Sequence, residues 1–167
     1  MHNELTEKDL ELMRQELEYR RTVLRPKLIE DVQTARAFGD LSENFEYKAA
    51  KRDKSRNDSR CRYLENMIKT AVVISDHSKE GTVGLYDKVT FYVEEDDEET
   101  TCQIVTTMRQ NALKGLVSKE SPVGKAVLGR KVGDRVTVQV NDSYSYDIII
   151  RAIEPGEDTG EAPLVRF

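Results

Sequence analysis

Hydrophobic positions recur at helical spacing in two long stretches of the first seventy residues. In the first stretch the positions lie three, four or seven residues apart, at Leu10, Met13, Leu17, Leu24, Leu28, Val32 and Ala35. In the second stretch spacings of three and four alternate without a break, at Tyr47, Ala50, Lys54, Asn57, Cys61, Leu64, Ile68 and Ala71. Such spacing places side chains on one face of an α-helix. The pattern predicts two amphipathic helices, the first capped by Thr6 and kinked at Pro26.

The segment between these helices predicts a tight turn. Gly39 is the only glycine among the first eighty residues, and glycine turns through positive φ without steric cost. Two helices joined in this way bury their apolar faces on each other. We therefore predict an antiparallel coiled-coil hairpin over residues 1–76, with its tip near residues 39–44.

Beyond residue 80 the hydrophobic period changes from helix to strand. Apolar residues alternate with polar ones in several short runs, which predict a small, mostly antiparallel sheet over residues 81–154. Ser121 as N-cap, Pro122 at the first helical position and Gly129 past the end predict one short helix. The fold class is therefore α+β. Residues 155–167 are rich in Pro, Gly and Glu, and we expect a flexible tail.

Composition and the lack of targeting patterns predict an intracellular protein. Charged residues make up 34% of its 167 residues, and the net charge is −5. No apolar run approaches the ~18–20 residues that span a bilayer, and the N-terminus lacks a secretory pattern. Two distant cysteines predict free thiols in a reducing cytosol. We expect a cytoplasmic protein without a membrane partner.

Basic residues are concentrated in the second helix. Between residues 48 and 62 there are seven of them, Lys48, Lys51, Arg52, Lys54, Arg56, Arg60 and Arg62, against two acidic ones, Asp53 and Asp58. One interpretation is an ordinary solvated helix face. The other is a basic stripe that follows a phosphate backbone.

Two carboxylates at the tip carry the candidate chemistry. Asp40 and Glu43 have the spacing of a capping box, with Asp40 as N-cap and Glu43 as the third helical residue. Alternatively, two outward carboxylates form a partial site for Mg²⁺, which often takes only one or two protein carboxylates. A partner would then have to supply the remaining ligands.

Two separated motifs resemble a known family. The tip reads Gly39-Asp40-Leu41-Ser42-Glu43-Asn44, followed by Glu46-Tyr47 and Ala49-Ala50-Lys51. The second motif reads Ser118-Lys119-Glu120-Ser121-Pro122-Val123-Gly124-Lys125-Ala126, followed by Leu128-Gly129. Both resemble signatures of the bacterial Gre transcript-cleavage factors, GreA and GreB, and the resemblance extends over residues 5–154.

The resemblance implies a C-terminal domain like the FK506-binding proteins, without isomerase activity. It also implies a monomer that binds backtracked bacterial RNA polymerase through its secondary channel. The residues matching Asp40 and Glu43 would help the polymerase hold Mg²⁺, supported by the tip residues Gly39, Leu41, Ser42, Asn44, Glu46 and Tyr47. The polymerase, not this protein, would then cleave the RNA 3′ end. The isolated protein would bind no cofactor stably.

Two contact surfaces follow from this picture. We expect the basic stripe to contact the extruded RNA or the channel wall, through Lys48, Lys51, Arg52 and Arg56. We expect the C-terminal domain to supply most of the affinity for polymerase, through a surface near Ser121 and Pro122.

Two departures from the family pattern leave other functions open. Phe45 stands where family members usually carry Ala, and residues 108–111 replace a usually acidic stretch. These departures predict a divergent paralogue. One alternative is a Gre-like inhibitor that occupies the same channel without promoting cleavage, and the other is a plain coiled-coil adaptor or chaperone.

Overall fold

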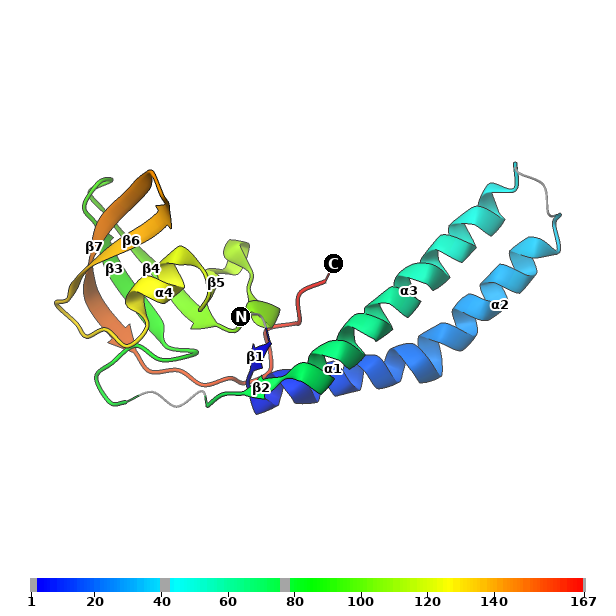
Figure 1. Ribbon diagram of the computed structural model, residues 1–167, viewed down its shortest axis with the longest axis horizontal. Coiled ribbons are helices and arrows are strands. Elements are labelled where there is room, and N and C mark those ends of the chain that lie inside the picture. The colour runs from blue at the N-terminus through cyan, green and yellow to red at the C-terminus, as the bar shows by residue number, and fades with distance from the viewer. Residues whose placement is uncertain (1–2, 40–42, 76–78, 167) are drawn as a thin grey trace. The chain divides into compact units, whose positions relative to one another are not determined.

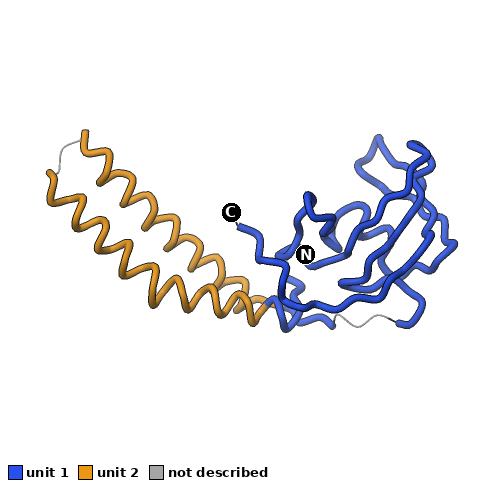
Figure 2. The backbone as a smooth tube through the Cα atoms, turned by 180° about the vertical axis from the view of Figure 1, so that it is seen from behind, with its two compact units in different colours: residues 1–9, 72–166 blue, residues 10–71, 167 orange. Residues whose placement is uncertain are grey.

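The computed structural model describes residues 3–39, 43–75 and 79–166. The chain divides into two compact units, one of residues 10–71 with residue 167 and one of residues 1–9 with 72–166 (Figure 2). Within the described ranges, no helix is both long enough and apolar enough to cross a membrane.

The first of these units is a helical hairpin. Its first arm consists of α1 (Glu7–Tyr19), whose first three residues are grouped with the other unit, a π-helical turn (Arg20–Leu24) and α2 (Arg25–Arg36). Its second arm is α3 (Phe45–Thr70). The arms run antiparallel and side by side (Figure 1), so the predicted coiled-coil hairpin is confirmed. Pro26 lies in the first turn of α2, directly after the π-helical turn. Proline cannot donate the backbone hydrogen bond of a regular helix, and the first arm changes direction where α1 passes into α2.

The hairpin is held together most strongly at its base. Leu10, Met13 and Leu17 of α1 are buried, as are the α3 residues Cys61, Leu64 and Met67. Burying one such side chain contributes about 1.5–3 kcal/mol. Toward the tip the seam residues Tyr47, Ala50 and Lys54 are only half-buried. The apolar stripes read from the sequence therefore do lie at the interface between the arms.

A polar layer interrupts this apolar seam. Arg60 donates from Nε to Glu16 Oε1 at 2.9 Å, and Arg20 donates to the same oxygen at 2.8 Å. Arg20 also donates from Nη1 to Asn57 Oδ1 at 2.9 Å. Burial alone would raise the pKa of Glu16, but the hydrogen bonds from Arg60 and Arg20 lower it. The layer thus joins the two arms through one carboxylate and two guanidinium groups.

The second unit is built on a five-stranded mixed sheet. Its strands lie in the order β5 (Leu116–Ser118), β4 (Glu98–Val105), β3 (Lys88–Val93), β7 (Tyr144–Glu154) and β6 (Arg135–Asn141). Only the β4–β5 pair is parallel among the pairs of this sheet. Alternate residues of β3, Val89, Phe91 and Val93, are buried in the core. The predicted α+β class is confirmed.

One short helix, α4 (Pro122–Val127), packs against this core. The Ser121 hydroxyl accepts a hydrogen bond from the Gly124 amide at 3.0 Å, and Pro122 opens the helix, as predicted. Gly129 follows with φ +78°, the left-handed conformation that favours glycine at a helix end. Two 3-10 turns, at Thr107–Arg109 and Ala112–Lys114, connect β4 to β5.

Residues 3–9 and the tail up to residue 166 also belong to this unit. Strand β1 (Glu4–Leu5) pairs in parallel with β2 (Val72–Val73). In the tail, the Gly156 amide donates to Asp87 Oδ1 at 3.1 Å and the Val165 amide donates to Met108 O at 2.7 Å. The domain bounds that we predicted from the sequence stay a prediction. The flexibility of residues 155–167 also stays a prediction, although the tail makes these two hydrogen bonds.

Candidate functional site

Asn44 joins the two arms at the tip of the hairpin. Its side-chain Nδ2 donates to Ala35 O at 3.0 Å and to Gly39 O at 2.6 Å. Its Oδ1 accepts from the Tyr47 amide at 3.0 Å. One side chain therefore binds a carbonyl in the last turn of α2 and one in the following turn, and it also caps the first turn of α3. Gly39, with φ +122°, takes a backbone conformation that L side chains rarely adopt.

This geometry corrects the capping-box interpretation of the tip. A box headed by Asp40 would place Glu43 at the third position of the helix. The N-cap of α3 is Asn44, and Glu43 precedes the helix in a turn. The N-cap position that the box assigns to residue 40 is therefore held by Asn44. Aspartate and asparagine cap about equally well, so the sequence could not choose between residues 40 and 44.

The structure describes only some of the predicted tip residues. Asp40, Leu41 and Ser42 lie outside the described residues. Glu43 and Glu46 are exposed at the described part of the tip. Tyr47 is half-buried, and the ammonium of Lys51 lies 5.2 Å from the centroid of its ring.

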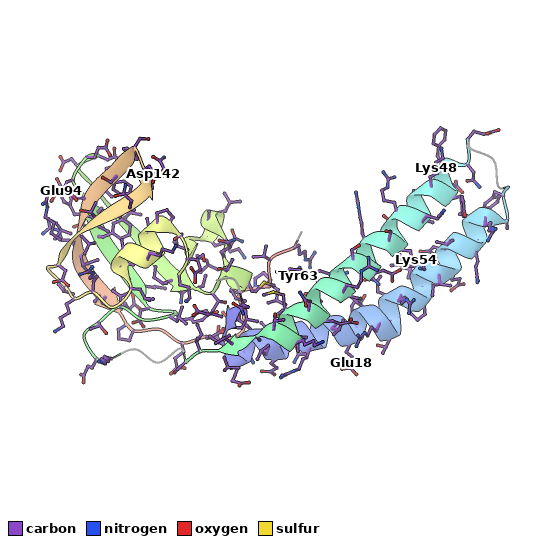
Figure 3. The ribbon with its side chains drawn as sticks, in the orientation of Figure 1. Glu18, Lys48, Lys54, Tyr63, Glu94 and Asp142 are labelled. Carbon is purple, nitrogen blue, oxygen red and sulfur yellow. The ribbon has the colours of Figure 1, made fainter. Side chains whose placement is uncertain are left out.

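The exposed part of the basic stripe behind the tip contains fewer basic side chains than the sequence of residues 48–62. Five of the seven basic side chains are exposed, namely Lys48, Lys51, Arg52, Arg56 and Arg62. Arg60 is buried and paired with Glu16, while Lys54 is half-buried and paired with Asp58 at 3.0 Å. Figure 3 shows Lys48 near the tip and Lys54 farther along the rod. All four side chains predicted to contact RNA or the channel wall thus face solvent.

A pocket lies beside the predicted docking residues of the C-terminal unit. Its volume is about 370 Å³, and it is lined by Phe91, Val93, Glu95, Asp96, Thr100, Cys102, Val117, Val123, Tyr144 and Tyr146. Val123 belongs to the first turn of α4, next to the exposed Pro122 and the half-buried Ser121. Burial raises the pKa of the Cys102 thiol to about 11. A hydrogen bond to Glu95 raises the pKa of Tyr144 to about 12. The pocket therefore combines apolar walls with two carboxylates.

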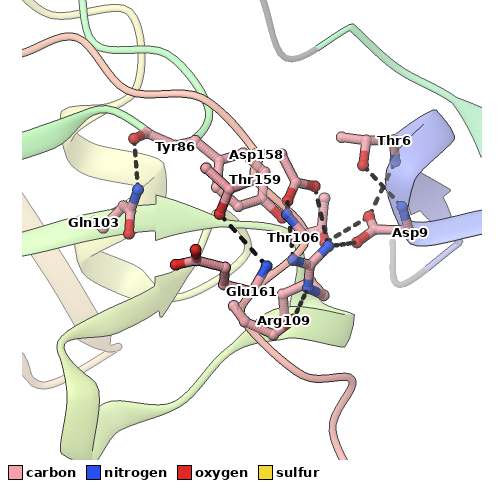
Figure 4. A network of polar contacts seen from close by, with 11 residues as sticks. Thr6, Asp9, Tyr86, Gln103, Thr106, Arg109, Asp158, Thr159 and Glu161 are labelled. Atoms are coloured by element: carbon pink, nitrogen blue, oxygen red, sulfur yellow. Dashed lines mark hydrogen bonds and ion pairs between the residues drawn. The ribbon is translucent and has the colours of Figure 1, made fainter. Parts of the chain in front are cut away.

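Sequence reasoning missed the role of Arg109. Its side chain is fully buried and donates to Asp158 at 2.9 and 3.0 Å and to Asp9 at 3.2 Å (Figure 4). Thr106 also donates to Asp9, at 2.7 Å. Burial disfavours the charge, but the hydrogen bonds to Asp158 prevail and raise the pKa of Arg109. This residue of the non-acidic 108–111 stretch is internal. No local signal marks it, because its partners lie about fifty and a hundred residues away.

The described geometry defines a class of protein with two kinds of unit: a helical hairpin whose arms Asn44 links at the tip, and a five-stranded sheet domain. Comparison with known families is consistent with that architecture. Residues 3–73 match the family model "Transcription elongation factor, N-terminal", and residues 77–155 match "Transcription elongation factor, GreA/GreB, C-term". The chain belongs to the GreA/GreB family of transcription elongation factors, as its motifs predicted.

Two relatives of known sequence agree with this assignment. Transcription elongation factor GreA of Geobacillus kaustophilus is 46% identical over 136 residues, which cover 81% of this chain and 86% of the relative. GreA of Bacillus subtilis is 41% identical over 135 residues, with the same coverage. Among solved structures, the transcription factor Gfh1 is 27% identical, with a TM-score of 0.45 and coverage of 93% of this chain and 99% of that one.

Proposed function

We propose that this elongation factor enters the secondary channel of backtracked RNA polymerase and stimulates hydrolytic cleavage of the RNA 3′ end. The observation that carries the proposal is the set of hydrogen bonds by which the Asn44 side chain links the end of α2 to the start of α3. Asn44 donates to Gly39 O and caps α3 at the Tyr47 amide, so a hydrogen bond links Gly39 to the N-cap of α3. Because Asn44 already caps α3, the capping task does not account for the carboxylates that precede it, and we assign them a task toward a partner.

The donor chemistry of the tip fits Mg²⁺. Carboxylate oxygens are ligands that Mg²⁺ accepts singly or in pairs, while water, phosphate or other groups complete the shell. Glu43 is exposed and precedes the helix, so its carboxylate can be presented to a partner. When bound, Mg²⁺ would activate water and stabilise the leaving oxygen of the RNA. The protein's own part is to bring two oxygen ligands to a site that the polymerase completes.

The C-terminal unit would supply the docking surface for polymerase. The pocket beside α4 has apolar walls and the carboxylates of Glu95 and Asp96. Such a site suits an apolar side chain that is followed by a basic one. Ser121 and Pro122 adjoin it, which supports the docking surface predicted near them. The exposed Lys48, Lys51, Arg52 and Arg56 would bind the phosphates of the extruded RNA or the channel wall.

The test is single-turnover RNA cleavage by a stalled, backtracked elongation complex. Asp40→Asn and Glu43→Gln should each lower the rate on the order of 10² to 10³, as expected for loss of a few kcal/mol of transition-state stabilisation. Polymerase competition and melting temperature should stay near the parental values. Higher Mg²⁺ should restore part of the rate by mass action.

Asp53→Asn is the matched control, because Asp53 is an exposed carboxylate of α3 away from the tip. It should cleave at the parental rate. Parental cleavage with both tip charges removed would refute the proposal. Inhibited RNA synthesis without cleavage by the parental protein would instead establish the inhibitor, and no competition for polymerase would favour the adaptor.

A further inference from the structure

Two phenylalanines are exposed on either side of the tip. The side chains of Phe38, in the turn after α2, and Phe45, the first residue of α3, are 74% and 75% exposed. Large apolar side chains contribute little to folding at such exposure, because they remain in contact with water. Burial in the hairpin therefore does not explain why either position carries an aromatic ring.

The backbone holds these two residues near each other. The Phe38 amide donates to Ala35 O at 3.2 Å, and the Asn44 side chain donates to the same oxygen at 3.0 Å. Phe45 directly follows Asn44 in the chain. The backbone of Phe38 and the residue before Phe45 thus hydrogen-bond to one carbonyl, which brings the backbones of the two phenylalanines close together.

Positive charge accompanies the aromatic rings. The Lys48 ammonium lies 5.8 Å from the centroid of the Phe45 ring, and Lys51 lies 5.2 Å from that of Tyr47. Arg52 and Arg56 are exposed farther along the same helix. Aromatic rings interleaved with basic side chains are how proteins bind single-stranded nucleic acid, since bases stack on rings while cations contact phosphates.

We propose that Phe38 and Phe45 form a stacking site for an unpaired base of single-stranded RNA, with Lys48 at the neighbouring phosphate. The inference rests on the proposed function, which brings the tip to an extruded RNA end. It adds a contact to the base itself, whereas the carboxylates would act on the scissile phosphate. Charge complementarity favours RNA over an apolar protein wall, because a protein wall would leave the adjacent ammonium groups unpaired.

The experiment uses the full-length protein and a stalled, backtracked complex whose extruded RNA carries 2-aminopurine at its 3′ end. Stacking on an aromatic ring quenches this base, so fluorescence reports the contact independently of cleavage. Phe45→Leu keeps the apolar surface but removes the aromatic ring, and Phe45→Trp keeps a stacking surface. Phe38→Leu tests the second ring in the same way. A parallel complex carries an abasic nucleotide at the same position.

Parental protein and Phe45→Trp should quench the fluorescence, while the two Leu variants should not. At subsaturating protein, each Leu variant should cleave about 10-fold more slowly, the size expected from one base–aromatic stack. On the abasic complex the parental protein should fall to the rate of the Leu variants. Equal losses on normal and abasic RNA would show that the rings contact protein, and would overturn the inference.

Failure of the inference can be distinguished from failure of the proposed function. Normal parental cleavage without quenching would refute stacking alone. Quenching without any cleavage by the parental protein would refute the proposed function and keep the stacking site. Absence of both from a complex that binds the protein would refute both.

Discussion

Replacing Arg109 by Met should strongly destabilise the C-terminal unit. Arg109 and the side chain of Asp9 are 0% exposed, and that of Asp158 is 2% exposed. The substitution keeps the aliphatic volume but leaves two buried carboxylates without their cation. Removing one partner of a buried ion pair typically costs about 3–5 kcal/mol, because the remaining charge is uncompensated.

This cost can be converted into a melting temperature. For a unit of about 100 residues, each kcal/mol corresponds to a shift of roughly 4 °C or more. We therefore expect the melting transition of the C-terminal unit to fall by about 12–20 °C. Arg109→Lys keeps the charge but loses the two-pronged contact with Asp158, so its loss should be intermediate.

Calorimetry of the full-length protein provides the assay, with Arg135→Met as a matched control. Arg135 also joins two carboxylates, Glu94 at 2.8 Å and Asp147 at 2.9 Å, but its side chain is 61% exposed. Water already solvates these groups, so the control should melt close to the parental protein. Equal effects of the two substitutions would refute the argument from burial. Amide exchange at Val165 should also accelerate in Arg109→Met, since the tail loses its anchor at Asp158.

Two further predictions follow from shifted pKa values. Because the pKa of Glu16 is lowered in the folded hairpin, its ion pair with Arg60 stabilises the protein at pH values above the ordinary carboxyl pKa near 4.5, and this stabilisation is lost as the pH falls through the lowered pKa. In denaturation experiments from pH 7 to pH 3, the difference in unfolding free energy between the parental protein and Glu16→Gln should therefore shrink. A constant difference would contradict this prediction. Because burial raises the pKa of Cys102 to about 11, its thiolate fraction at pH 8 should be on the order of 10² below that of an ordinary thiol; thiol-specific labelling followed by peptide mapping should find slow modification of Cys102, and rapid labelling of the folded protein would refute the burial argument.

The sequence by itself determined the elements whose signals are local. Spacings of three and four residues specified both arms of the hairpin, and alternation specified the strands. Ser121 and Pro122 marked the start of α4, and Thr6 caps α1 as predicted, accepting from the Asp9 amide at 3.2 Å. Each signal works because the backbone geometry of a helix or strand repeats over a few residues.

The tertiary structure alone decided the features that depend on distant partners. Asn44 is the cap of α3, and its amide also donates to Ala35 O at the end of α2 and to Gly39 O in the turn that follows. Arg60 is not part of the exposed basic stripe, because its side chain is buried and bound to Glu16 of the facing helix. Arg109 became internal because the fold brings carboxylates from both ends of the chain to it. The local sequence around a charged side chain does not show whether that side chain will be solvated or buried. Only the packed chain determines whether its partner is water or a buried opposite charge.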